Sequence, residues 1–281
     1  MSISLEDLRA NLAQKMKLFI TGTATGGAVG SIIDTNGLAH LPEDDVLNNG
    51  LAYIREDAGG AGAAPEGEHR FISDFDQGTQ TITLAANLTA AVAAGDTYEV
   101  YLTTLSLAQW DEAINAAIEA AWPEVWEPTI YEVDSFGGDE YPLPAAARDV
   151  RGIEVVFTGA LAGYSAEPIP RAHWKLHGTP GTDLTVYLAR PVPSLGRRLR
   201  VDYKQRYVEL AAGESTDLDE TYLNLAARAE VHATLAKASG QTDISRHSQM
   251  MVHYQGLAEA RKAKLAQVLA GVPVMGEGKK K

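Results

Sequence analysis

The stretch that decides the fold is SLAQWDEAINAAIEAAWPEVW, residues 106–126. Four apolar residues recur at every fourth position within it: Trp110, Ile114, Ile118 and Trp122. This spacing places them on one face of an α-helix. Ser106 suits the N-cap, and Pro123 lacks a backbone N–H and disfavours helical geometry in the residue before it. We therefore predict a buried amphipathic helix, the core strut of the molecule, that ends near Trp122.

A β-rich region lies on each side of this helix. Residues 17–104 contain short alternating or β-branched runs, among them LFITGT, HRFISDF, TQTITLA and DTYEVYL, separated by Gly, Asn and Asp. Residues 128–210 contain the runs IEVVF, DLTVYLA and RRLRVDYKQRYVE. Such runs bounded by turn residues are typical of strands. We predict a small β-barrel or sandwich module in 17–104 and a second β module in 128–210.

Further helical patterns occur near both ends of the chain. Residues 4–16 begin with a capping serine and carry leucines on one side, which predicts a short helix that needs a partner to be stable. Residues 216–271 predict a helical hairpin with a break near Gly240. The predicted fold class is α+β, a bundle of about four helices with two inserted small all-β modules. Its helical core comprises 1–16, 105–127 and 216–271, and 272–281 form a C-terminal tail.

The composition excludes several classes of protein. The 281 residues are 45% hydrophobic and include no cysteine, so disulfides, thiolate catalysis and cysteine-based zinc sites are excluded. No apolar run approaches the roughly 18 residues that a bilayer-spanning helix needs. We therefore expect a soluble protein that is made and used without membrane targeting.

Charge is distributed unevenly along the chain. The net charge is −13; residues 1–127 carry 5 Lys/Arg against 19 Asp/Glu, a net −14, and residues 128–281 carry 19 against 18, a net +1. A surface of net negative sign repels a phosphate backbone. General binding to nucleic acid is therefore disfavoured.

A search for catalytic or ligand-binding motifs finds neither a nucleophile elbow, a Walker A loop, a dinucleotide loop nor a zinc-type histidine pair. His232, His247 and His253 are interpreted as ordinary surface or core histidines. The carboxylates near Asp44 and Asp76 could bind a cation, but solvated turn residues are the better interpretation because the ligand spacing of a calcium loop is missing. We expect no catalytic site, no cofactor and no metal, and hence not an enzyme.

Several longer stretches follow one another in a recognisable order. The first β region and the helix after it carry GTATGGAVGSIIDTN, HRFISDFDQGTQTITLAANLTAAVAAGDTYEVY and LSLAQWDEAINAAIEAAWP. The later part carries YEVDSFGGDEYPLPAAARDVRGIEVVF, EPIPRAHWKLHG, RRLRVDYKQRYVEL and DLDETYLNLAARAEVHATLAKASG. In this order they resemble the head-to-tail adaptor (neck or connector) proteins of tailed bacteriophages. The resemblance covers most of the chain, although none of the stretches is a catalytic motif.

This resemblance implies a structural virion protein at the head–tail interface, made in the host cytoplasm. Copies of the chain, twelve in such a ring, would bind the portal protein on one side and a downstream tail or nozzle protein on the other. DNA would pass through the channel without specific binding, past acidic residues of the N-terminal half. The residues expected at the portal contact are the basic ones of the last helix and tail: Arg261, Lys262, Lys264, Lys279, Lys280 and Lys281.

Two alternatives remain. The chain could be a tail-fibre or baseplate component that uses its β modules for attachment, although it lacks long repetitive or coiled segments. It could instead bind carbohydrate, with tryptophans as stacking platforms: Trp110, Trp122, Trp126 and Trp174. Exposed tryptophans would favour that second alternative.

Overall fold

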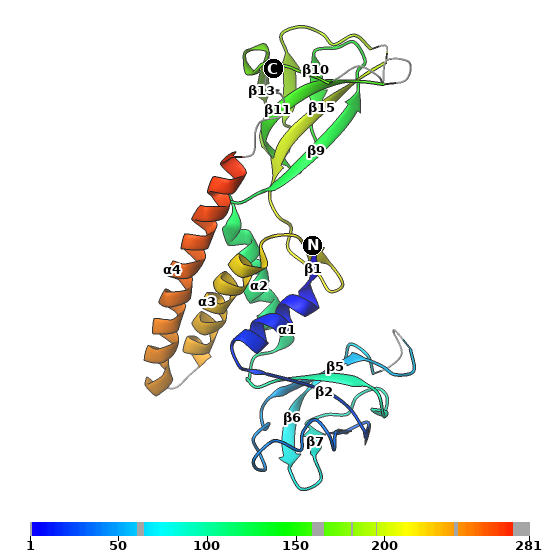
Figure 1. The fold of residues 1–281 in the computed structure, drawn as a ribbon, viewed down its shortest axis with the longest axis vertical. Helices are drawn as coiled ribbons and strands as arrows, with labels where there is room; N and C mark the ends of the chain where they lie inside the picture. The colour runs from blue at the N-terminus through cyan, green and yellow to red at the C-terminus, as the bar shows by residue number, and fades with distance from the viewer. Residues whose placement is uncertain are drawn as a thin grey trace, which may run out of the picture. The chain divides into compact units, whose positions relative to one another are not determined.

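The computed structural model describes residues 2–60, 65–158, 166–180, 182–194, 196–238 and 241–271. Within these ranges the chain forms four α-helices and four β-sheets (Figure 1). It divides into two compact units. Unit 1 is Met1–Ala116 with Leu210–Gln255, and unit 2 is Ala117–Glu209 with Gly256–Lys281.

The main sheet of unit 1 has seven strands, and all their pairings are antiparallel. In sheet order they are β2 (Phe19–Thr23), β8 (Thr97–Tyr101), β5 (Leu51–Glu56), β6 (His69–Asp76), β7 (Thr81–Leu84), β4 (Ser31–Ile33) and β3 (Gly26–Ala28). Alternate side chains of β7 and buried side chains of β5 pack in one hydrophobic cluster. Ile32, Ile82 and Tyr98 lie at its centre with no exposed surface.

Four further elements complete unit 1 together with parts of two longer helices. Helix α1 (Leu5–Lys15) follows β1 (Ile3–Ser4), which pairs with β16 (Ser215–Thr216). Ser4 caps α1 by accepting a hydrogen bond from the Asp7 N–H at 3.1 Å, as the sequence predicts. Its buried face includes Leu8 and Leu12. Helix α3 (Glu220–Ala238) contacts α1, where the Lys15 ammonium lies 3.0 Å from a Glu220 carboxylate oxygen.

Two helices, α2 (Leu107–Ala121) and α4 (Gln241–Gly271), contribute residues to both units. α2 is the predicted strut. Its Trp110, Ile114 and Ile118 are at most 2% exposed, which confirms the buried face. The helix ends at Ala121, because Pro123 disfavours its continuation. Trp122 therefore lies beyond the helix and is half-buried.

Unit 2 contains two antiparallel sheets. The four-stranded sheet runs β12 (Glu167–Pro168), β11 (Ala147–Phe157), β15 (Arg197–Gln205), β9 (Glu127–Asp134), and the three-stranded sheet runs β10 (Glu140–Pro142), β14 (Thr185–Leu188), β13 (Trp174–His177). A 3₁₀ turn, Arg171–His173, precedes β13. Both sheets bury side chains in one cluster, whose fully buried members include Tyr141, Val186 and Val201.

The predicted fold class is wrong. Within the described ranges the structure is 29% helix and 32% strand, so it is mostly β with four helices and not a helical bundle that carries small β modules. The helices occur close to their predicted positions, but the short β runs join into sheets of seven and four strands, each with its own core. Both compact units combine helix with sheet, whereas the predicted domain bounds separate the two. Those bounds stay a prediction.

Candidate functional site

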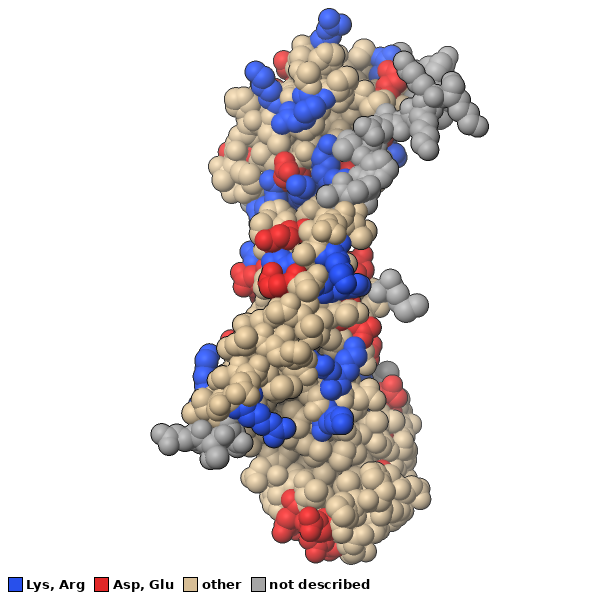
Figure 2. Space-filling view, turned by 60° about the vertical axis from the view of Figure 1, so that its left-hand side comes forward, with Lys and Arg blue, Asp and Glu red and all other residues tan. Residues whose placement is uncertain are grey.

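Among the four helices, α4 has the smallest share of buried residues. Only Ala258 and Lys262 are buried among its described side chains, although it spans 31 residues. Four large apolar residues on it are exposed: Ile244 (39%), Val252 (62%), Leu257 (41%) and Val268 (67%). Figure 2 views the molecule from the side of this helix, where Lys and Arg side chains flank a broad uncharged area. These side chains lie on more than one side of the helix, because Val252 and Val268 are separated by about 160° around its axis at 100° per residue. They leave apolar surface of α4 open to a partner.

The buried side of α4 is a narrow stripe. Tyr254, Ala258, Lys262 and Leu265 follow one another at helical spacing and are buried or half-buried, as expected for residues three or four apart. Val268 follows Leu265 by three positions, but it is 67% exposed. Exposed residues outside this stripe, such as Val252 and Leu257, are available to another molecule.

The predicted basic contact residues of α4 do not behave alike. Lys262 is 8% exposed, and its ammonium donates to the Ala120 carbonyl at 2.7 Å and pairs with Glu124 at 2.8 Å. The hydrogen bond from Lys262 lowers the pKa of Glu124. Lys262 therefore holds α4 against Ala120 and Glu124, and its charge is already paired by Glu124. Arg261 is half-buried and Lys264 is exposed. Lys279, Lys280 and Lys281 lie outside the described residues.

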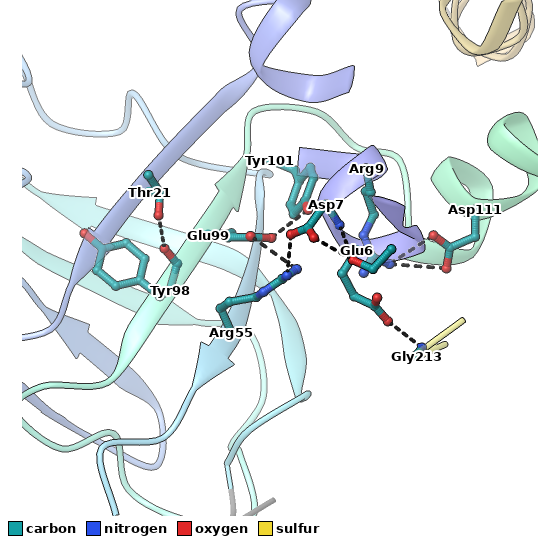
Figure 3. A network of polar contacts seen from close by, with 11 residues as sticks. Glu6, Asp7, Arg9, Thr21, Arg55, Tyr98, Glu99, Tyr101, Asp111 and Gly213 are labelled. Atoms are coloured by element: carbon teal, nitrogen blue, oxygen red, sulfur yellow. Dashed lines mark hydrogen bonds and ion pairs between the residues drawn. The ribbon is translucent and has the colours of Figure 1, made fainter. Parts of the chain in front are cut away.

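A network of buried charges holds α1 against α2 (Figure 3). The Arg9 side chain is 5% exposed, and one of its terminal nitrogens donates to both carboxylate oxygens of Asp111, at 3.0 and 3.2 Å. Its guanidinium also lies over the Tyr53 ring, 5.4 Å from the centroid. Burial raises the pKa of Asp111, and the charge of Arg9 opposes that rise. The pair thus fixes the position of α1 on α2.

A second arm of the network joins α1 to the seven-stranded sheet. Arg55 of β5 lies 2.7 Å from Asp7 of α1 and 3.8 Å from Glu99 of β8. Glu99 is 5% exposed and accepts a hydrogen bond from the Tyr101 hydroxyl at 2.7 Å. Burial raises the pKa of Glu99 despite the opposing effects of Tyr101 and Arg55.

This network has a structural role, because it joins α1 to α2 and to the seven-stranded sheet. Its arginines are paired with carboxylates from other elements, and removing one partner of such a buried pair leaves an uncompensated charge. Sequence reasoning missed it, because Arg9 and Asp111 are 102 positions apart and neither belongs to a motif. The one available signal was the position of a basic residue, Arg9, on the leucine-bearing side of the first predicted helix.

The acidic turns of unit 1 use their carboxylates to stabilise loops. Asp44 accepts from the Gln77 N–H at 2.7 Å, and Asp76 accepts from the Thr79 N–H at 3.0 Å. The described residues contain no group of three or more His, Cys, Asp or Glu side chains arranged to hold a metal ion. No helix among them is both long enough and apolar enough to cross a membrane.

Most of the tryptophans are unavailable for stacking on a sugar. Trp110, Trp126 and Trp174 are at most 6% exposed. The Arg151 guanidinium lies 4.6 Å from the ring centroid of Trp126, and that of Arg171 lies 3.8 Å from the ring centroid of Trp174. These tryptophans therefore pack inside the protein.

Comparison with known proteins does not identify a family. No family model matches the chain, and no curated protein matches it significantly.

Proposed function

We propose that this chain is a structural subunit that assembles with copies of itself into a ring, as a head-to-tail adaptor between a phage portal and its tail. The observation that carries the proposal is the exposure of α4. A 31-residue helix, about 46 Å long at 1.5 Å per residue, leaves Val252, Leu257 and Val268 in solvent. Burying such residues against a neighbouring chain is favourable by roughly 25 cal/mol per Å² of apolar surface.

Charge favours another copy of the same chain as the partner of α4. The C-terminal half of α4 carries Arg261 and Lys264, whereas residues 1–127 carry a net −14. A neighbouring copy therefore offers an acidic surface to a basic helix segment, and such complementarity speeds and orients association. A ring follows when the two contacting surfaces differ and the rotation between copies closes.

Passage of DNA through such a ring needs a wall to which phosphate does not adhere. The acidic excess of residues 1–127 would supply that wall through like-charge repulsion. The portal and a downstream tail or nozzle protein would be the other partners, and no catalytic step is required of the chain. Replacing several acidic residues of this half by lysine should then slow DNA ejection.

The assembly is tested by light scattering after size-exclusion chromatography, and by electron microscopy of the neck of the particle. We expect Val252→Asp and Val268→Asp to lower the mass of the oligomer. Val208→Asp is the matched control, because Val208 is also 67% exposed but lies outside α4. If the isolated chain is monomeric, electron microscopy of the particle is the test. Density of this chain in a closed ring against the portal supports the proposal, and density elsewhere contradicts it.

A further inference from the structure

A pocket of about 460 Å³ lies in unit 1, outside the charge network. Its walls come from the end of α1, the residues after β8, and the facing sides of α3 and α4. The polar residues that line it are Lys15, Lys17, Thr103, His232, Arg246, His247 and Tyr254. The apolar ones are Met16, Leu18, Leu102, Leu235 and Met250. This volume is in the range of small-molecule sites.

The charge of the pocket is of one sign. Among the described residues that line it, Lys15, Lys17 and Arg246 are cationic and none is Asp or Glu. Lys15 is paired with Glu220 at 3.0 Å. For Lys17 and Arg246, the described part of the chain supplies no acidic partner. The two side chains thus leave uncompensated positive charge at the pocket, which favours an anion.

Two histidines meet at the wall of the pocket. The Nδ1 atoms of His232 on α3 and His247 on α4 lie 3.0 Å apart. One ring must donate a hydrogen and the other must accept it, so the pair can hold one extra proton but not two. The Tyr254 ring stacks on His232 at 5.6 Å, with an interplanar angle of 1°. Arg228 covers the Tyr254 ring at 5.1 Å, and its buried Nε has no hydrogen-bond partner among the described residues.

The backbone at Lys17 points to a role for its side chain. Lys17 has φ +61°, in the left-handed region that glycine adopts without steric cost. It follows the C-terminus of α1, where the Leu18 N–H donates to the Ala13 carbonyl at 2.9 Å. Glycine is the usual residue at such a helix end. A lysine there keeps an ammonium group at the pocket at some cost in backbone energy.

We propose that this pocket binds a phosphate-type oxyanion and takes up a proton at the histidine pair as it does so. The lysine and arginine attract the anion, and the imidazole pair adds a positive charge when the anion is present. The apolar wall and Tyr254 leave room for an organic group attached to the phosphate. A metal ion is disfavoured, because Arg228 and Arg246 repel a cation near His232.

The direction of the pH dependence follows from the surroundings of His232. Burial is the largest effect that lowers the pKa of His232 to about 4, followed by electrostatic repulsion from His247, Arg228 and Arg246. His232 is therefore neutral in the empty pocket above about pH 4. A bound anion opposes the repulsion by these charges, so it raises the pKa of His232. By linkage, the anion binds more tightly as the pH falls through the raised pKa of His232 towards 4.

The test follows the ring signals of the histidines by NMR from pH 7 to pH 4, in sodium sulfate and in sodium chloride of equal ionic strength. Sulfate keeps its charge over this range, so a change reports the protein. We expect sulfate to raise the pH of half-protonation of His232 by about one unit, which corresponds to tenfold tighter binding by the protonated form. An unchanged midpoint would overturn the proposal. So would binding of zinc chloride at pH 7 that moves both ring signals.

Variants distinguish the loss of a charge at the pocket from a loss of folded structure. Lys17→Gly removes the ammonium and suits the backbone, so sulfate binding should weaken by about tenfold in a protein that remains folded. His247→Gln should remove the sulfate-dependent shift of His232. Lys175→Ala and His40→Gln are matched controls, because both residues are exposed and neither lines the pocket. Equal weakening by Lys17→Gly and Lys175→Ala would refute a specific site.

A last comparison identifies the source of the phosphate. Inorganic phosphate and adenosine monophosphate are titrated against the wild-type chain at one pH. Tighter binding of the nucleotide would assign the pocket to phosphate monoesters that use the apolar wall, and equal binding would assign it to the free oxyanion. If neither competes with sulfate, the assignment to phosphate chemistry is wrong. The proposed ring does not enter this test, so the two proposals can fail separately.

Discussion

Helices α2 and α4 both contribute residues to the two units but differ in what they bury. α2 buries seven of its 15 residues, including Trp110, Ile114 and Ile118. α4 is twice as long, yet only two of its described side chains, Ala258 and Lys262, are buried. α2 therefore stabilises the single chain, whereas much of α4 is left for a partner. A helical pattern by itself therefore does not specify whether the helix packs within its own chain or against a partner.

The largest effect is expected at the centre of α2. Trp110 has no exposed surface and packs 5.8 Å from the Tyr101 ring, measured between centroids. Trp110→Ala should lower the free energy of unfolding by about 3–5 kcal/mol, because it removes buried apolar contacts and leaves a cavity. Urea unfolding followed by circular dichroism measures the change. A loss below about 1 kcal/mol would contradict the role assigned to α2.

A somewhat smaller loss is expected where α2 is joined to α1. Arg9→Met keeps the apolar stem of the side chain but leaves Asp111 without its cation. The Asp111 side chain is 28% exposed, so the loss should be about 2–3 kcal/mol, below the full cost of orphaning a buried charge.

The double variant Arg9→Met with Asp111→Leu serves as the control for this pair. It should recover part of the loss, because no unpaired carboxylate remains. A double variant less stable than Arg9→Met alone would show that the unpaired Asp111 carboxylate is not the cause of the loss. Both values come from the same urea titrations.

A smaller loss of stability is expected at Lys262, the buried charged residue among the described side chains of α4. Lys262→Met removes the hydrogen bond to the Ala120 carbonyl and the ion pair with Glu124, at a cost of about 1–2 kcal/mol. Lys264→Met is the matched control on the same helix, since Lys264 is exposed, and should change stability by less than about 0.5 kcal/mol. Equal losses in the two variants would show that the buried and exposed sides of α4 do not differ in their contribution to stability.

The smallest effect on stability is expected on the exposed side of α4. Val252→Asp should shift the free energy of unfolding of the monomer by less than about 0.5 kcal/mol, although it should weaken self-association. Unfolding at low protein concentration and light scattering at high concentration separate these two effects. A large loss of monomer stability would mean that Val252 packs within its own chain, and the contrast with α2 would fail.

Sequence reasoning worked where a signal is local. The face of α2 follows from apolar residues four apart, the end of that helix follows from Pro123, and the cap of α1 follows from Ser4. Each depends on neighbours within a few positions. Periodicity does not by itself give burial: Val268 lies three positions after the half-buried Leu265 and is 67% exposed, because a helical pattern marks a face but does not supply a partner for it.

Contacts between distant positions could not be predicted in this way. The Arg9–Asp111 pair spans 102 positions, and the sheet order β2-β8-β5-β6-β7-β4-β3 follows no rule that the sequence displays. The meeting of His232 and His247 needs the reversal of the chain between α3 and α4, and a spacing of 15 residues does not specify it. For the same reason the short β runs predict small modules, whereas the structure joins them into larger sheets.

By itself, then, the sequence determined where helices begin and end, the absence of cysteine chemistry, and the acidic excess of residues 1–127. These depend on composition and on side chains that are close along the chain. Only the tertiary structure decided that the protein is mostly β, that Lys262 is used internally while Val252 is left exposed, and that a basic pocket forms at α1, α3 and α4. Burial and charge pairing depend on which distant residues are brought together, and a linear pattern does not encode that directly.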